Sequence, residues 1–247
     1  MSPSIAECEL THLERVPIDV TRAEAQHAEY EATLRSLGVT VVRVAAAPAL
    51  PDAVFIEDTA IVLDEIALVT RPGARARRAE LDAVRGALME YRPVIALDAP
   101  ATLDGGDVLR VDRTLYVGRS GRTNDEGIEQ LRRLVRAYDY EVVPVAFSGC
   151  LHLKSAVTEV ADRVLLLNPA WVHASAFSGC EVVEVAEGEP FAANGLRIEN
   201  RVIYSSQYPL TRDALVQRGV QPALVDSSEL AKAEGAVTCC SLVFTSS

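Results

Sequence analysis

The 247-residue sequence predicts an α/β fold in which five similar units close into a ring. Along the chain, a β-hairpin, a helix and a single strand recur in this order about every 45 residues. The first unit lacks its own hairpin, while one strand is left over at the C-terminus. Pairing the leftover strand with the first unit would close the ring and remove exposed sheet edges. We therefore expect a single domain that spans residues 1–247.

The first unit consists of a helix and a strand at the front of the chain, together with the C-terminal strand. Thr21 and Glu24 fit a capping box, in which each side chain accepts from the backbone N–H of the other residue, and they predict a helix that runs to Leu37. The strand VTVVRV follows at residues 39–44. The segment TCCSLVF, residues 238–244, would supply the missing hairpin strand.

Each of the other four units begins with a hairpin of β-type residues. The second unit has its hairpin, helix and strand at residues 55–70, 74–91 and 94–98. The third has them at residues 103–118, 124–138 and 141–147, with Asn124 as the helix N-cap. The fourth has a hairpin at residues 151–169 and a strand at 181–186, with the weakest helix signal of the chain between them. The fifth has its three elements at residues 192–206, 211–218 and 222–226.

The ring would bring the heads of the hairpin strands together at a common axis. The residues at these heads are Glu57 with Asp58, then Asp104, His152, Asn194 and Cys239. From Asp58 onward their separations are 46, 48, 42 and 45 residues. The predicted fold thus collects carboxylates, an imidazole and a thiol at one place.

The composition excludes several classes of partner. A net charge of -11, from 24 basic and 35 acidic residues, argues against nucleic acid and anionic membranes, which both require a basic face. The sequence has no apolar run long enough to span a bilayer and no secretory signal at its start, so we expect a cytoplasmic protein. Its five cysteines lack C-x-x-C spacing, which indicates reduced thiols rather than a disulfide framework or a zinc knuckle.

The residues at the strand heads suggest hydrolysis at a guanidinium carbon. Cys239 is the candidate nucleophile, because a nearby imidazole or a cationic substrate can lower the pKa of a thiol. His152 would serve as general acid and then as general base, with Asp104 in the LDGGD turn orienting its ring. Glu57 and Asp58 would bind a cation, most naturally a planar guanidinium.

Other interpretations of the same residues remain open. Cys239 and Cys240 are adjacent, so they cannot easily form a disulfide, and both could be buried packing residues. His152 could be a hydrogen-bonded core histidine, and Glu57 with Asp58 could be turn or cap residues. Zinc is a further alternative for Cys, His and Asp ligands, although here each unit would supply only one ligand and none supplies a local pair.

Six stretches occur in the order known from one enzyme family. They are PDAVFIEDTA (51–60), LVTRPGARARRAE (68–80), APATLDGGDVL (99–109), YVGRSGRTNDEG (116–127), GCLHLKSAV (149–157) and SELAKAEGAVTCCS (228–241). With them the chain resembles the dimethylarginine dimethylaminohydrolases (dimethylargininases) of the pentein, or guanidine-modifying, superfamily. The resemblance implies a five-bladed α/β propeller. It also implies hydrolysis of N-omega-methylated arginines to citrulline and a methylamine, without metal or organic cofactor.

The resemblance also implies roles for individual residues. Cys239 would be the nucleophile, His152 the acid and base, and Asp104 its orienting carboxylate, while Cys240 would be inert. The residues implied for the guanidino substrate are Glu57 and Asp58 for the guanidinium, Asp52 for the α-amino group, Phe55 as a pocket wall, Arg77 and Arg122 for the α-carboxylate, and the backbone carbonyls of Ala233 and Leu10 for the ammonium.

The start of the chain departs from the family pattern, because members begin with a strand upstream of the first loop. On this pattern the first unit would be one strand short, and the covering loop and the contact of Leu10 would lack its support. Two competing functions are a sister guanidine hydrolase or amidinotransferase acting on arginine or another guanidino compound, and a non-catalytic binder on the same scaffold. We expect the protein to act on a small molecule as a monomer or homodimer.

Overall fold

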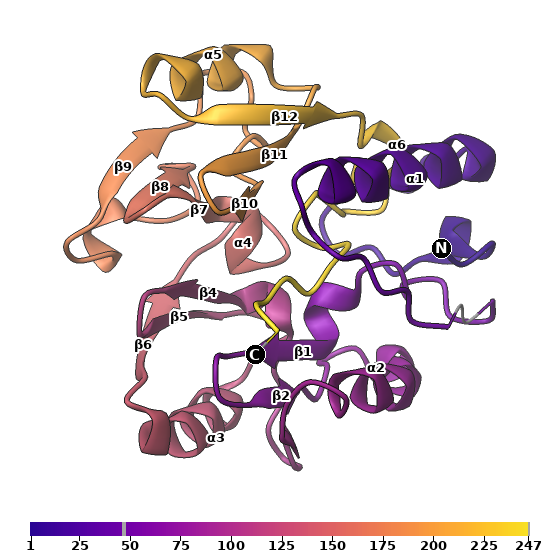
Figure 1. Cartoon of the computed structure of the whole chain (residues 1–247), viewed down its shortest axis with the longest axis vertical. Helices are drawn as coiled ribbons and strands as arrows, with labels where there is room; N and C mark the ends of the chain where they lie inside the picture. Colours follow the sequence, from indigo (N-terminus) through magenta and orange to yellow (C-terminus); the bar gives the residue numbers. More distant parts are fainter. Residues whose placement is uncertain (46–47, 247) are drawn as a thin grey trace.

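Four three-stranded sheets of one design form the framework of this computed structural model, which describes residues 1–45 and 48–246 (Figure 1). In each sheet, two strands form an antiparallel hairpin, and the second of them pairs in parallel with a third strand. Parallel neighbours need a crossover connection, which is a helix in three of the four sheets.

The element bounds follow the chain. The strands are β1 (Ala60–Val62), β2 (Ala67–Val69) and β3 (Val94–Ala96); β4 (Val108–Val111), β5 (Thr114–Arg119) and β6 (Glu141–Ala146); β7 (Val157–Ala161), β8 (Val164–Leu167) and β9 (Glu181–Glu184); β10 (Gly195–Ile198), β11 (Arg201–Ser205) and β12 (Gln221–Val225). The helices are α1 (Val20–Ser36), α2 (Leu81–Leu88), α3 (Asp125–Val135), α4 (Leu153–Ala156), α5 (Pro209–Gln217) and α6 (Ser228–Ala231). Short 3-10 helices are η1 (Ile5–Glu7), η2 (Ile56–Thr59), η3 (Arg75–Glu80), η4 (Gly105–Asp107), η5 (Arg136–Tyr138) and η6 (Ala174–Ala176).

The structure confirms the hairpins and parallel strands predicted for the second to fifth units. The crossover helices α2, α3 and α5 lie where the sequence placed them, with η3 preceding α2. Asn124 caps α3 as predicted, since its side-chain oxygen accepts from the N–H of Gly127 at 2.8 Å. The weak helix signal of the fourth unit corresponds only to the short η6, so this crossover is mostly irregular.

Neighbouring units are held together by shared apolar cores. Leu68 of β2 and Leu115 of β5 are fully buried in one cluster between the first two sheets. Leu109 of β4 and Leu165 of β8 join the second sheet to the third, and a further cluster around Tyr204 joins the third to the fourth. Because the cores lie between units, the sheets follow one another around the molecule in Figure 1.

The predicted capping box of the first helix is wrong. The N-cap of α1 is Asp19, two residues before Thr21, and its carboxylate accepts from the N–H of Arg22 at 3.0 Å. Thr21 and Glu24 both lie inside the helix. A carboxylate is as good an N-cap as a hydroxyl, and here it occupies the position where the backbone is still extended.

The two strands predicted for the first unit are also not formed. Residues 39–44 and 241–246 have no strand assignment, and Cys239 and Cys240 lie in a turn. Their side chains alternate as in strands: Val39 and Val41 pack inward, as do Leu242 and Phe244. Among the described residues, no backbone hydrogen bond joins the two segments, which line one broad groove with α1 and α2. A fifth sheet is therefore absent from the described residues.

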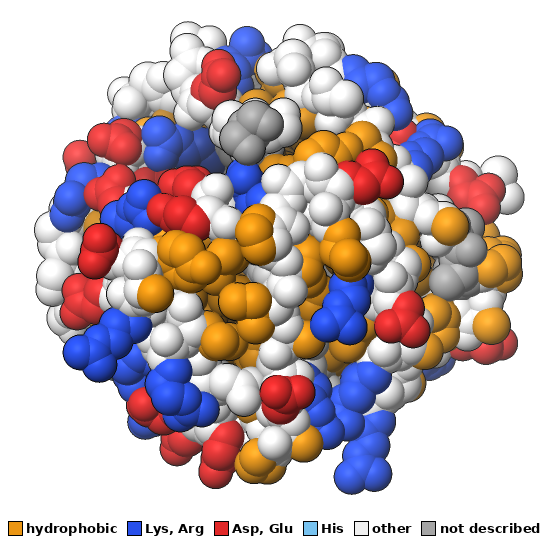
Figure 2. Space-filling view, turned by 60° about the horizontal axis from the view of Figure 1, so that its bottom comes forward, with side chains coloured by type: hydrophobic (Ala, Val, Ile, Leu, Met, Phe, Trp, Pro, Cys, Tyr) orange, Lys and Arg blue, Asp and Glu red, His pale blue; other side chains and the backbone are white. Residues whose placement is uncertain are grey.

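The surface carries both acidic and basic side chains, as expected from the 35 acidic and 24 basic residues of the sequence. Figure 2 shows apolar side chains near the centre of one face, with acidic and basic side chains interspersed around them. Across residues 1–45 and 48–246, no helix combines the length and apolar character that a membrane crossing would need.

The Asn124 cap provides a test of the fold. Its Oδ1 also accepts from the N–H of Thr102 at 2.9 Å, so Asn124→Ala leaves two backbone donors without this partner. We expect the free energy of unfolding to fall by about 1–2 kcal/mol, measured by urea denaturation. Asn200→Ala, at an exposed turn position, should change it by less than about 0.5 kcal/mol. Equal effects of both substitutions would contradict the role of the cap.

Candidate active site

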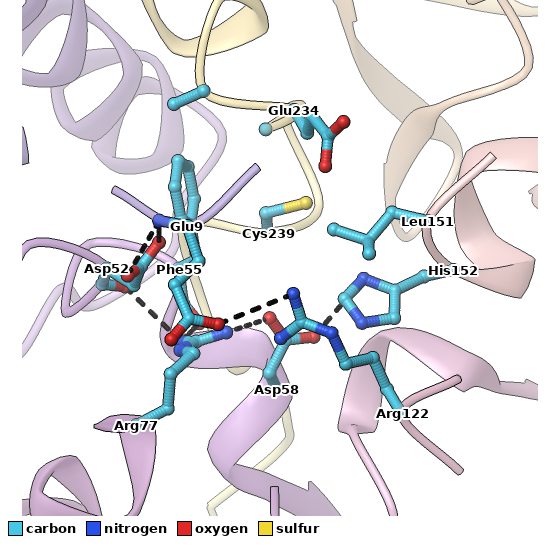
Figure 3. A pocket seen from close by; sticks show the side chains of 12 residues that line it. Glu9, Asp52, Phe55, Asp58, Arg77, Arg122, Leu151, His152, Glu234 and Cys239 are labelled. Carbon is cyan, nitrogen blue, oxygen red and sulfur yellow. Dashed lines mark hydrogen bonds and ion pairs between the residues drawn. The ribbon is translucent and has the colours of Figure 1, made fainter. Parts of the chain in front are cut away.

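A small cavity lies where the heads of the hairpin strands meet the N-terminal segment (Figure 3). Its lining includes eight residues singled out from the sequence: Asp52, Phe55, Asp58, Arg77, Arg122, His152, Ala233 and Cys239. It also includes Glu9, Leu151, Glu234 and Gly235, which sequence reasoning missed. The cavity volume is about 20 Å³, enough for about one water molecule. A larger ligand therefore requires the residues that cover the cavity to move.

His152 is held between two buried carboxylates. It lies just before α4 in extended backbone, and its Nε2 is 3.1 Å from Oδ2 of Asp104. Its Nδ1 lies 3.7 Å from Oδ1 of Asp58. The predicted pairing of His152 with Asp104 is thus present, and Asp58 is a second partner that the sequence did not reveal.

Gly106 allows this close approach. A Cβ at this position would lie 2.6 Å from Oδ1 of Asp58 and 2.7 Å from Nδ1 of His152, where there is no room for it. The N–H of Gly106 also donates to Oδ1 of Asp58 at 3.0 Å. Gly106, the second glycine of the LDGGD turn, is therefore required, because any larger residue would overlap the side chains of Asp58 and His152.

The charges around His152 favour its protonated form. Burial alone lowers the pKa of the imidazole, but the carboxylates of Asp58, Asp104 and Asp107 outweigh it and raise the pKa from 6.5 to about 9. His152 is therefore an imidazolium at neutral pH. Such a group can donate a proton to a leaving amine.

Cys239 also favours its protonated form, which for a thiol is the neutral one. Its sulfur points into the cavity in Figure 3, close to Leu151. Burial, followed by the charges of Glu57 and Asp58, raises the pKa of the thiol well above 9. We expected a nearby imidazole or a cationic substrate to lower this pKa. The imidazolium alone does not do so, because the carboxylates and burial dominate.

Glu57 and Asp58 both carry resident partners. Lys154 donates to Oε1 of Glu57 at 2.6 Å, and the Thr238 hydroxyl donates to Oε2 at 2.9 Å. Asp58 forms a buried ion pair with Arg77. Despite complete burial, which raises it, the pKa of Asp58 is lowered by the charges of His152 and Arg77.

The two arginines have different surroundings. Arg77 is only 4 % exposed, and besides Asp58 it donates to Oε2 of Glu80 at 2.8 Å and to the carbonyl of Phe55 at 2.7 Å. Its guanidinium is thus already engaged within the protein. Arg122 faces the N-terminal segment instead, with Nη2 at 3.1 Å from the Thr11 hydroxyl. Arg122 is the arginine with fewer fixed partners.

Residues 9–13 cover the cavity and are fastened by two carboxylates. Asp52 accepts from the N–H of Glu9 at 3.3 Å. Glu234 accepts from the backbone N–H groups of Thr11, at 2.9 Å, His12 and Leu13. Glu9 lines the cavity, whereas the side chain of Leu10 packs beside the core that contains α1. Glu234 and Gly235 lie in the stretch SELAKAEGAVTCCS (228–241) that the sequence analysis quoted, but their roles were not assigned there. Gly235 packs against the Phe55 ring, since a Cβ at this position would lie 2.2 Å from it.

Only some of the ligands that a zinc site with Cys, His and Asp would need lie together in the described residues. Asp58, Asp104 and His152 offer ligand atoms within 4.8 Å of one another. The Cys239 sulfur is not a member of this cluster in the described part of the chain. Since both imidazole nitrogens face carboxylates, the cluster is accounted for by charge pairing around a protonated histidine.

The chain is similar in sequence and in structure to proteins of one family. Residues 13–240 match the family described as N,N dimethylarginine dimethylhydrolase, eukaryotic. The N(G),N(G)-dimethylarginine dimethylaminohydrolase of Streptomyces coelicolor is 38% identical over 98% of this chain and 93% of the relative. That of Pseudomonas aeruginosa is 32% identical over 92% of this chain and 90% of the relative. A crystal structure of the Pseudomonas aeruginosa enzyme, a Cys-to-Ser variant with citrulline, superposes with a TM-score of 0.94 at 31% identity, covering 98% of this chain and 96% of that chain.

The protonation of His152 can be measured directly. The chain has four histidines, so their imidazole protons can be followed by NMR during a pH titration. We expect His152 to titrate near pH 9, and Asp104→Asn to shift its midpoint down toward 6.5. Asp162→Asn, at an exposed turn, should leave the midpoint unchanged. A wild-type midpoint near 6.5 would contradict the charge arrangement described here.

Proposed function

Because this chain belongs to the dimethylarginine dimethylaminohydrolase family, we propose that it hydrolyses N-omega-methylated L-arginines to L-citrulline and dimethylamine or methylamine. The observation that carries the proposal is the presence of Cys239, protonated His152 and Asp58 in the wall of one cavity. A nucleophile, a proton donor and an anionic partner for a guanidinium are the groups that this reaction requires.

The first half of the proposed reaction forms a covalent intermediate. Binding of the cationic guanidinium stabilises the Cys239 thiolate, and the thiol proton is released to solvent. The thiolate attacks the guanidinium carbon, forming a C–S bond. His152 donates its proton to the departing nitrogen as the C–N bond breaks, so that dimethylamine leaves and a thiouronium remains.

The second half regenerates the enzyme. Neutral His152 takes a proton from a water molecule, whose oxygen attacks the thiouronium carbon. The C–S bond then breaks, citrulline forms, and Cys239 recovers its proton. Asp104 holds the ring through Nε2 during both halves and stabilises the imidazolium whenever it forms.

The remaining residues are proposed to recognise the amino acid part of the substrate. Asp52 would bind the α-ammonium with the carbonyls of Ala233 and Leu10, and Phe55 would form a wall beside the side chain. Arg122 would bind the α-carboxylate. Arg77 would join it only after exchanging partners, because its donors are occupied by Asp58, Glu80 and backbone carbonyls. Since the cavity is small, residues 9–13 would open to admit the substrate.

The names of solved relatives support this assignment. The Pseudomonas aeruginosa enzyme binds citrulline in one structure, and another structure shows a His-to-Gly variant of a dimethylarginine dimethylaminohydrolase as an adduct with S-methyl-L-thiocitrulline. The second of these structures superposes on this chain with a TM-score of 0.93. Both ligands share the amino acid part of the substrate that we propose.

Several expectations from the sequence complete the proposal. We propose that residues 1–247 form a single catalytic domain and that its units complete a five-bladed propeller when the first unit forms its sheet. We also propose that the protein acts in the cytoplasm, as a monomer or homodimer. Size-exclusion chromatography with light scattering tests the last point.

Activity is tested by citrulline formation. Incubation with asymmetric dimethylarginine, monomethylarginine and arginine in parallel should yield citrulline fastest from a methylated arginine. Cys239→Ser should reduce the rate at least about a thousandfold, because a hydroxyl is a far weaker nucleophile in this site. Wild-type activity no higher than that of Cys239→Ser would rule out the proposed reaction. Preference for arginine would favour a sister guanidine hydrolase.

The neutral resting state of Cys239 leads to a second test. At pH 7, cationic chloroacetamidine should alkylate Cys239 at least about tenfold faster than neutral chloroacetamide, after both rates are divided by those of a small-molecule thiol. The cation brings the charge that ionises the thiol, whereas the neutral probe does not. Labelling is read at the Cys239 peptide by mass spectrometry, because Cys150 and Cys240 have their pKa values raised to about 12 by burial and nearby acids. Equal corrected rates would contradict ionisation by the cation.

A further inference from the structure

Lys154 is an unusual residue in this chain. Of the 24 basic residues only two are lysines, Lys154 and Lys232, and the other 22 are arginines. Lys154 lies in α4, two residues after His152, and its side chain is 17% exposed. Its ammonium group contacts Glu57, one of the carboxylates proposed to bind the guanidinium. In the described part of the chain, Lys154 is thus the cationic side chain that pairs with the Glu57 carboxylate.

Glu57 and three residues around it form a closed circuit of hydrogen bonds. Lys154 Nζ donates to Oε1 of Glu57 at 2.6 Å, and the Thr238 hydroxyl donates to Oε2 at 2.9 Å. The same hydroxyl accepts from Asn194 Nδ2 at 2.9 Å, and this amide nitrogen also donates to the carbonyl of Lys154 at 2.9 Å.

The circuit is attached directly to the nucleophile. Thr238 precedes Cys239 in the chain, and its N–H donates to Oδ1 of Asn194 at 3.1 Å. On the other side, the N–H of Glu57 donates to the carbonyl of Cys239 at 3.1 Å. Both carboxylate oxygens of Glu57 are therefore fixed, and the backbone N–H of the same residue is bonded to the backbone of the reactive residue.

Three carboxylates at or beside the cavity already have cationic partners before any ligand arrives. Asp58 is paired with Arg77, Asp104 with His152 and Glu57 with Lys154. An unpaired Glu57 would attract a guanidinium more strongly, but it would also oppose ionisation of the neighbouring thiol. With the pairs in place, an incoming cation adds net positive charge, which favours the thiolate.

We propose that Lys154 is a positioning residue that fixes Glu57 and neutralises its charge beside Cys239, so that the substrate guanidinium supplies the positive charge that ionises the thiol. The proposal rests on the function proposed above. Lysine suits this task because its ammonium is a single point charge that occupies one carboxylate oxygen, whereas the fork of an arginine would cover both.

The titratable and charged groups around Cys239 come from several elements, and Lys154 acts among them. They are Glu57 and Asp58 of η2, Tyr30 of α1, Arg77 of η3, Asp104 just before η4, Arg122 of the loop before α3, His152 and Lys154 at α4, the adjacent Cys240, and the acids Glu9, Asp52 and Glu234 that line the same cavity. Removing Lys154 makes this set more negative by one charge. The Cys239 thiolate is then less stable than in the wild-type protein, whereas the affinity for a cationic ligand is unchanged or higher.

Four variants separate charge from position and from folding. Lys154→Met removes the charge and keeps the length of the side chain, while Lys154→Arg keeps the charge. Thr238→Val removes the other anchor of Glu57 without changing charge. Lys232→Met is the matched control, because the ammonium of Lys232 is paired with Glu229 at 2.7 Å. Thermal unfolding followed by circular dichroism shows whether each variant is folded.

Two readouts are measured: the pH dependence of Cys239 alkylation by chloroacetamide, and kcat and KM for asymmetric dimethylarginine. For Lys154→Met we expect the alkylation midpoint to rise by about one pH unit. We also expect kcat to fall about tenfold, with KM unchanged or lower. Lys154→Arg should restore the alkylation midpoint. Thr238→Val should lower kcat without moving the midpoint, and Lys232→Met should change neither.

A folded Lys154→Met variant with the wild-type alkylation midpoint would overturn the proposal, as would a midpoint that shifts equally in Lys154→Arg. The alkylation arm needs no turnover, so it tests Lys154 even if the wild-type protein forms no citrulline. Failure of wild-type activity counts against the proposed function, whereas an unchanged midpoint counts against Lys154.

Discussion

The contact of His152 with two buried carboxylates is the interaction on which the rest of the site depends. It joins η2, η4 and the start of α4, three segments that belong to successive units. Buried charges are costly unless they are paired, and here Asp58 is paired with Arg77 and Asp104 with His152. The pairing explains why the turn before β4 contains glycines, why Arg77 is withdrawn into the interior, and why both the His152 imidazole and the Cys239 thiol stay protonated.

A second carboxylate in the same turn extends this arrangement. Asp107 is fully buried and accepts from the hydroxyls of Ser120, at 2.6 Å, and Thr123, at 2.7 Å, and from the N–H of Leu153 at 3.0 Å. It therefore holds the loop that carries Arg122 against the segment that carries His152. The LDGGD turn places one acid on the imidazole and the other on the backbone around it, so five residues organise two sides of the cavity.

Much of the fold was readable from the sequence because its signals are local. Hairpin alternation and the Asn124 cap depend on neighbouring residues, and they were predicted correctly. The strands expected at residues 39–44 and 238–244 have the right apolar alternation, but a strand also needs a partner, which no local pattern guarantees. The α1 cap was misassigned because Asp19 and Thr21 are both residue types that cap helices well. In the structure the backbone is extended at Asp19 and already helical at Thr21, so Asp19 is the cap. In the site, residue types identified Cys239, His152 and Asp104 as neighbours, while the engagement of Arg77 and the raised pKa of Cys239 arise from three-dimensional charge and burial.

One structural link has a consequence for the timing of events in the reaction cycle. Glu234, which fastens the backbone of residues 11–13, stands five residues before Cys239 in the same loop. A movement of the covering segment therefore pulls on the stretch of chain that presents the sulfur. Entry of a ligand and alignment of the attacking atom become mechanically coupled, and the residence time of the product depends on how readily Glu234 and Asp52 release their backbone partners.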